Sequence, residues 1–208
     1  MERAYDDVVH PIERLRFVAR AEGVPAEVLA VEATTALMTF ADEPAALVAG
    51  CRRVLSRQLS CGPLWWACAR LLTADDIRGT AIETVRALEG DTTGPALSLA
   101  IDPDADDPPA LVRALAIGDG SAVAVADQLD AARDSGAPVW LVGGVGRQLC
   151  DPLWSALVEH WTLDPRRNED LVTLSEFTHL VGPDGPVPIS ATRPADCPVA
   201  PELFRLAG

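Results

Sequence analysis

The sequence feature that most constrains the fold is an apolar run followed by a glycine-rich turn and a helix-like segment, over residues 138–161. Val139–Val142 is typical of a strand buried on both faces of a parallel sheet. The glycines at 143–146 permit a tight turn, and Asp151 with Pro152 begins the next helix. Ligands of open α/β sheets bind beyond the carboxyl ends of such strands, so this turn marks the expected place of a site.

Before this unit, the first ninety residues predict five short amphipathic helices. Prolines or capping residues begin each of them, and apolar residues recur at helical spacing. The predicted starts are Pro11, Pro25, Asp42-Pro44, Gly62-Pro63 and Thr73. Short helices joined by tight turns form a bundle, so we expect residues 1–90 to be a helical subdomain.

From residue 95 onward, strand-like and helix-like segments alternate. The candidate strands are Ala96–Ile101, Val112–Ile117, Val139–Val142, Leu171–Leu174 and Phe177–Val181, with a helix from Ala122 to Ala132 between the second and third. This alternation predicts an α/β fold, a small parallel Rossmann-like sheet flanked by helices. We therefore expect a helical N-terminal subdomain (1–90), a Rossmann-like α/β domain (95–190) and an extended C-terminal tail (191–208).

Composition excludes several classes of function. The net charge of −14 argues against sequence-independent nucleic-acid binding. All 17 basic residues are arginine, which removes lysine Schiff-base chemistry and the P-loop lysine. No apolar run approaches the roughly 20 residues of a membrane span, and we expect no membrane association. The five cysteines are scattered without a CxxC pair, so we expect a cytoplasmic protein with reduced thiols.

The glycine turn after Val142 is the first candidate binding site. The backbone amides of Gly143, Gly144 and Gly146 can approach an anion closely, and Arg147 can bind a phosphate with two hydrogen bonds. The alternative is a tight strand-to-helix connection with an exposed Arg147. We expect no cofactor here, and no metal site at the acidic, proline-rich loop 102–109, which lacks the glycine and terminal glutamate of a calcium loop.

A second glycine turn, formed by Gly118, Asp119, Gly120 and Ser121, follows the strand-like segment that ends at Ile117. Asp119 could accept a hydrogen bond from a ribose hydroxyl or act as a general base, and Ser121 could bind phosphate. The alternative is that Ser121 caps the following helix and Asp119 is a turn residue. Two such turns on neighbouring strands favour a shared pocket.

Four segments also carry a family resemblance, in order along the chain. Ser60–Ala67 is similar to a segment of that family in which a helix starts beside a sugar-phosphate site. Gly118–Ala122 stands at the position of a turn that carries the catalytic cysteine of the family's enzymes. Val139–Leu157 resembles the strand, arginine loop and helix that follow, and Leu180–Gly185 a region with a catalytic aspartate. The family is that of the translation initiation factor 2B alpha, beta and delta subunits and the methylthioribose-1-phosphate isomerases.

The resemblance implies a fold and phosphate binding, but Gly118 stands where the isomerases have their cysteine. We therefore expect a non-catalytic or regulatory protein that binds a phosphorylated metabolite or nucleotide. One alternative is an isomerase-like enzyme that uses Asp184 or Asp119 as acid and base. Another is a ligand-free dimer scaffold, because Trp65 and Trp66 point in different directions on one helix and one of them could meet a second subunit. We expect a homodimer.

Overall fold

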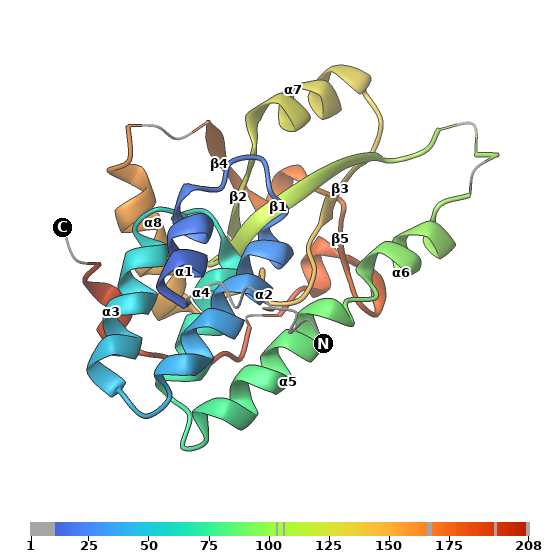
Figure 1. The fold of residues 1–208 in the computed structure, drawn as a ribbon. Coiled ribbons are helices and arrows are strands. Elements are labelled where there is room, and N and C mark those ends of the chain that lie inside the picture. Colours follow the sequence, from blue (N-terminus) through green and yellow to red (C-terminus); the bar gives the residue numbers. More distant parts are fainter. Residues whose placement is uncertain (1–10, 103, 106, 166–167, 194, 207–208) are drawn as a thin grey trace, which may run out of the picture.

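The computed structural model describes residues 11–102, 104–105, 107–165, 168–193 and 195–206. A six-stranded sheet forms the centre, and helices pack against both of its faces (Figure 1). The predicted α/β class is therefore confirmed.

The first half of the chain is helical, as the apolar spacing predicts. The helices are α1 (Pro11–Arg20), α2 (Ala26–Leu37), α3 (Pro44–Leu55), α4 (Gly62–Leu72) and α5 (Ile77–Glu89), with a short 3-10 turn at Met38–Phe40. Proline stands at the start of the first four, where its missing N–H removes no helical hydrogen bond. The predicted cap of the fifth helix is wrong: Asp76 is the N-cap and accepts a hydrogen bond from the Gly79 amide, while Thr73 ends α4.

Residues 93–100 form a helix, α6 (Thr93–Ala100), where the sequence predicted a strand at Ala96–Ile101. The run is rich in alanine and leucine and carries no β-branched residue before Ile101, so its apolar character suits either element. Asp91 decides between them, because its carboxylate accepts hydrogen bonds from the Thr93 amide and hydroxyl at 2.9 and 2.6 Å. These bonds hold the first turn of the helix.

The sheet has the order β4-β2-β1-β3-β5-β6. Its strands are β1 (Ala110–Gly118), β2 (Ser121–Val125), β3 (Val139–Val142), β4 (Glu169–Thr173), β5 (His179–Gly182) and β6 (Gly185–Pro188). The three central strands β1, β3 and β5 are parallel, while β2, β4 and β6 pair antiparallel outside them. The prediction of a parallel sheet is right for the centre, and β3 lies between two parallel neighbours as its double-sided apolar run requires.

Two further helices complete the layers. Helix α7 (Ala126–Ser135) packs Leu129 and Ala132 against the face of the sheet that carries Val112 and Leu141. The predicted helix began at Ala122, but residues 121–125 form β2, so α7 starts four residues later. Helix α8 (Asp151–Thr162) joins α1–α5 in the core on the opposite face.

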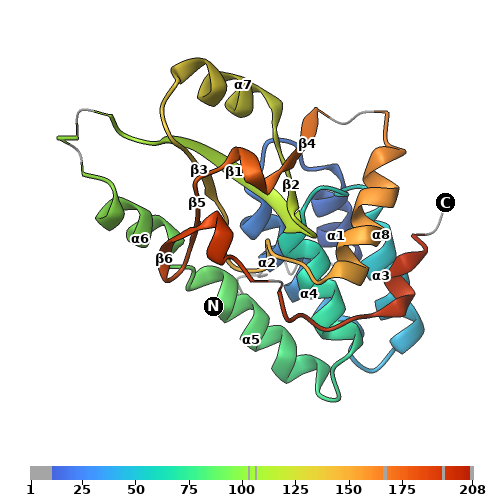
Figure 2. The ribbon, with the colours of Figure 1, turned by 180° about the vertical axis from the view of Figure 1, so that it is seen from behind.

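The C-terminal tail crosses this second face and contributes to its core (Figure 2). Leu203, in a 3-10 turn at Pro201–Phe204, is fully buried, and Cys197 and Ala200 are buried beside it. The Arg52 side chain on α3 donates a hydrogen bond to the Glu202 carbonyl at 2.7 Å. The tail thus packs on α3 and α8 instead of lying only on the surface.

Candidate functional site

The glycine loop after β3 leads the chain back to strand β1, beside the sheet edge where β3 ends. Strand β1 is longer than β3, and the segment that follows the glycine loop pairs with the end of β1. The Ile117 amide donates a hydrogen bond to the Arg147 carbonyl, and the Leu149 amide donates one to the Ile117 carbonyl, both at 2.8 Å. This pairing places Gly144, Gly146 and Gln148 at the carboxyl ends of β3 and β5, where the sequence predicts a site.

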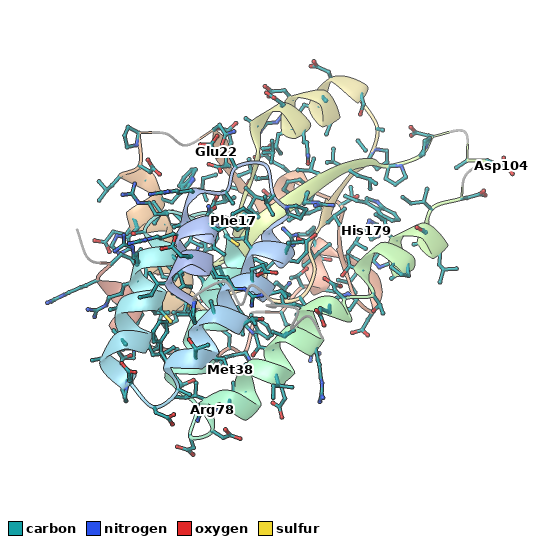
Figure 3. The ribbon with its side chains drawn as sticks, viewed as in Figure 1. Phe17, Glu22, Met38, Arg78, Asp104 and His179 are labelled. Atoms are coloured by element: carbon teal, nitrogen blue, oxygen red, sulfur yellow. The ribbon has the colours of Figure 1, made fainter. Side chains whose placement is uncertain are left out.

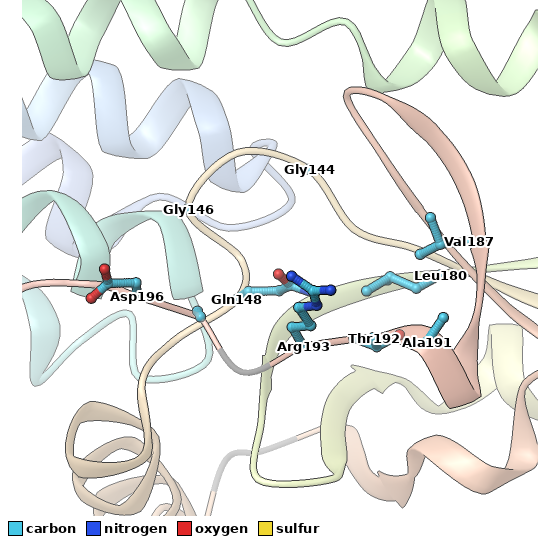
Figure 4. Close-up of a pocket in the computed structure, with 10 residues that line it drawn as sticks. Gly144, Gly146, Gln148, Leu180, Val187, Ala191, Thr192, Arg193 and Asp196 are labelled. Carbon is cyan, nitrogen blue, oxygen red and sulfur yellow. The ribbon is translucent and has the colours of Figure 1, made fainter.

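A cavity of about 450 Å³ opens beside this loop (Figure 4). Its walls come from three segments: the glycine loop, the β5–β6 hairpin, and the start of the C-terminal tail. The lining residues are Gly144, Gly146, Gln148, Leu180, Val187, Ala191, Thr192, Arg193, Ala195 and Asp196. This volume lies within the range of small-molecule sites, about 300–1,000 Å³.

The tail supplies polar groups to the cavity that lack partners. The Thr192 hydroxyl oxygen is buried and has no hydrogen-bond partner among the described residues. The Arg193 side chain is exposed and points into the cavity, as does Gln148 (Figure 4). Within the part of the chain described, the Arg193 guanidinium makes no ion pair or hydrogen bond. A buried hydroxyl without a partner and a free cation are the groups that an anionic ligand can satisfy.

Arg147 is not the exposed cation that the sequence suggested. Only 5% of the residue is exposed, and its guanidinium donates to a Glu27 carboxylate oxygen at 2.8 Å and to the Ala114 carbonyl. Burial lowers the Arg147 pKa, and the nearby Glu27 opposes that shift. The chain reverses at Gly146, with φ of 73°, and this turn sends the side chain inward between α2 and β1.

A carboxylate of the protein itself occupies part of the glycine loop. The Val145 amide donates to Asp91 at 2.9 Å, and a side chain on Gly144 would place its Cβ 2.6 Å from the same Asp91 oxygen. The predicted contact joined an anion to the amides of Gly143, Gly144 and Gly146, whereas the amide that meets a carboxylate here is that of Val145, and Asp91 is its partner. Asp91 was not among the predicted site residues, although an aspartate two residues before Thr93 is a common signal of helix capping.

The second glycine turn is the tip of a β-hairpin. Asp119 and Gly120 have φ of 39° and 68°, and positive values at both central residues are those of a type I′ turn. Ser121 begins β2 and donates its hydroxyl to the Gly118 carbonyl at 3.2 Å, so its predicted role as a helix cap is wrong. None of the four residues lines the cavity, and the expected convergence of the two glycine turns does not occur there.

Gly118 is closely covered by helix α8. A Cβ at this position would lie 2.4 Å from Cγ of Trp154, a separation that side chains do not tolerate. A cysteine could not replace Gly118 without displacing the tryptophan. The two candidate acids, Asp119 and Asp184, are exposed at hairpin turns, and neither lines the cavity.

The tryptophan pair on α4 has its partners within the same chain. Trp65 is fully buried and donates to the Leu59 carbonyl at 2.9 Å. Trp66 covers Gly146 and lies under the guanidinium of Arg70, 4.9 Å from the ring centre. The tryptophans therefore do not require a second subunit, and the homodimer stays a prediction.

Asp104, in the acidic loop, lies far from the body of the molecule (Figure 3). Residues 103 and 106 of this loop lie outside the described part of the structure. Among the described residues, no group of three or more histidine, cysteine or acidic side chains could hold a metal ion. In the same part of the chain, no helix is long and apolar enough to cross a membrane.

The order of strands and the helical layer on the sheet can be compared with solved structures. The crystal structure of translation initiation factor eIF-2B from Pyrococcus horikoshii OT3 matches with a TM-score of 0.64, at 14% identity, over 85% of this chain and 96% of that one. This chain has the eIF-2B-like fold. No protein-family model matches the sequence. No curated protein matches it either. The resemblance carried by the four sequence segments is thus confirmed for the fold.

Proposed function

We propose that this eIF-2B-like chain is a non-catalytic, regulatory protein that binds a phosphorylated metabolite or nucleotide in the cavity at the carboxyl ends of β3 and β5. One observation carries the proposal: two polar groups without partners line the same cavity in the part of the chain described. They are the buried Thr192 hydroxyl and the guanidinium of Arg193. Arginine binds phosphate with two parallel hydrogen bonds, and a hydroxyl can donate a third.

The other lining groups suit the rest of such a ligand. Gly144 and Gly146, both predicted from the sequence, line the cavity, although Asp91 and Trp66 fill the space that side chains at these two positions would take. Gln148 offers an amide, and the Asp196 carboxylate can accept hydrogen bonds from sugar hydroxyls. The combination favours a ligand with a phosphoryl group at one end and hydroxyls at the other.

Binding is better supported than turnover, because the two carboxylates considered as acid and base, Asp119 and Asp184, lie outside the cavity. The protein as a whole carries a net charge of −14, which repels anions at long range. Affinity must therefore come from short-range contacts with Arg193 and its neighbours.

Calorimetry with ribose 5-phosphate, ribose and inorganic phosphate tests the proposal. We expect ribose 5-phosphate and inorganic phosphate to bind, and Arg193→Ala to weaken their binding by about 10- to 150-fold, the effect of about 1.5–3 kcal/mol expected for a charged hydrogen bond. Arg205→Ala is the matched control, since Arg205 is an exposed arginine of the same tail outside the cavity. Unchanged affinity in Arg193→Ala, or equal binding of ribose, would contradict the proposal.

A further inference from the structure

Two cysteines that are 47 residues apart in the sequence lie in contact. The sulfur atoms of Cys150 and Cys197 are 2.7 Å apart, and the Cys150 amide also donates to the Cys197 sulfur at 3.1 Å. Cys150 is the N-cap of α8, and Cys197 lies in the C-terminal tail. Both are free thiols in this structure.

We propose that Cys150 and Cys197 form a reversible disulfide that ties the C-terminal tail to the start of helix α8. Their separation is shorter than a non-bonded sulfur contact and only roughly 0.7 Å longer than an S–S bond of about 2.0 Å. Both residues lie outside regular helix and strand interiors, so small backbone shifts can close the remaining distance.

The other three cysteines differ from this pair in access. Cys51, Cys61 and Cys68 are buried in the helical core, where an oxidant cannot reach their sulfur atoms. Cys150 is partly exposed, so an oxidant can react with it first. Cys197 is only 8% exposed and is therefore less accessible. This is the arrangement of an attacking and a resolving cysteine.

A low-molecular-weight disulfide such as oxidised glutathione is the oxidant that the reaction requires. The Cys150 thiolate attacks one sulfur of glutathione disulfide, and the first glutathione thiolate leaves. The Cys197 thiolate then attacks the Cys150 sulfur and releases the second. Two protein thiols lose two electrons and two protons, and one glutathione disulfide becomes two glutathione molecules. Inside cells, such protein disulfides are usually transient, which agrees with the expectation of reduced thiols.

Burial raises the Cys197 pKa to about 12. Because the thiolate is the nucleophile, the rate of the second step should increase by up to about tenfold for each unit by which the pH rises toward that pKa.

The bond would also affect the cavity, a consequence that rests on the proposed function. The tail residues that form one wall of the cavity lie shortly before Cys197 in the sequence, and they are Ala191, Thr192, Arg193, Ala195 and Asp196. A bond at Cys197 anchors that wall to α8, so the oxidised protein should hold phosphate several-fold more tightly than the reduced protein.

Thiol counting on the full chain tests the disulfide by itself. The protein is equilibrated in glutathione redox buffers, quenched in acid, unfolded, alkylated and mapped by mass spectrometry. We expect it to lose two of its five thiols and to yield a Cys150–Cys197 linked peptide. Cys197→Ser should stop at a glutathione adduct on Cys150, and Cys61→Ala, as the matched control, should still form the bond.

Five free thiols at every redox ratio would overturn the proposal, as would a persistent glutathione adduct in the unmodified sequence or a disulfide between other cysteines. Phosphate affinity is measured separately on the reduced and oxidised proteins. If the disulfide forms but affinity stays equal, the coupling to the cavity is wrong and the disulfide stands. If neither form binds phosphate, the proposed function fails and the disulfide again stands.

Discussion

Arg147 joins helix α2 to strand β1 from inside the protein. Its guanidinium bonds to Glu27 on α2 and to the Ala114 carbonyl on β1, and only 6% of its side chain is exposed. Loss of the Arg147 guanidinium leaves the buried Ala114 carbonyl without this hydrogen-bond donor, and it leaves the Glu27 carboxylate without its closest cation. We expect Arg147→Met to lower the free energy of unfolding by about 2–4 kcal/mol, measured by urea denaturation.

Arg133→Met is the control at the same scale. Arg133 pairs with Asp130 and Glu176, but 48% of its side chain is exposed, so its loss should lower the free energy of unfolding far less than the loss of Arg147 does. Equal effects of the two substitutions would show that the burial of Arg147 does not matter to folding.

The β1–β2 hairpin decides how the central strand continues. Its type I′ turn sends the chain back along β1 as β2, and β2 in turn pairs with β4, so half of the sheet depends on this reversal. The right-handed twist of the two strands favours a turn with positive φ at both central residues. Such a turn needs glycine or a small polar residue, and Asp119 and Gly120 meet that need.

Gly120→Ala should therefore destabilise the protein by about 1–2 kcal/mol, because alanine is strained at φ of 68°. Nothing lies within 4 Å of the added methyl group, so the loss comes from the backbone alone. Gly182→Ala is the control, an equally open position without positive φ, and should be nearly neutral. Thermal unfolding of both variants gives the comparison. A neutral Gly120→Ala would argue against the hairpin turn.

At the scale of the whole molecule, one core holds the helical half and the sheet together. Cys61, at the start of α4, lies in that core, and its thiol donates to the Ala26 carbonyl at 3.5 Å. Burial raises the Cys61 pKa from 9.0 to about 12. An unfolded chain exposes this thiol to water, where it ionises near its ordinary pKa.

Stability should accordingly fall as the pH rises from about 9 toward 12. In this window the unfolded state releases the Cys61 proton and the folded state keeps it, which contributes a slope of about −1.4 kcal/mol per pH unit. Denaturant unfolding in reducing buffer between pH 8 and 10.5 measures the slope. Cys61→Ala should remove this share of it, and an identical slope in that variant would refute the assignment.

Much of the architecture could be predicted because its signals are local. Proline starts and apolar spacing define α1–α4, and the double-sided apolar run of Val139–Val142 places β3 inside the sheet. The glycine loop at the end of β3 lies beside a cavity, and its role in binding stays a prediction. Helix and strand periodicity act over a few residues, and a sequence displays them directly.

Only the tertiary structure decided which groups meet. The sequence by itself determined the helical half, the β3 strand and the glycine loop, because these follow from short-range sterics and patterning. It could not determine that Arg147 turns toward Glu27 or that Asp91 accepts a hydrogen bond from a backbone amide of the loop. Nor could it determine that the tail brings Arg193 to the cavity and Cys197 to Cys150. Arg147 with Glu27, Asp91 with Val145, Cys197 with Cys150, and Arg193 with the glycine loop are each more than 40 residues apart in the sequence, and packing against one shared core brings them together.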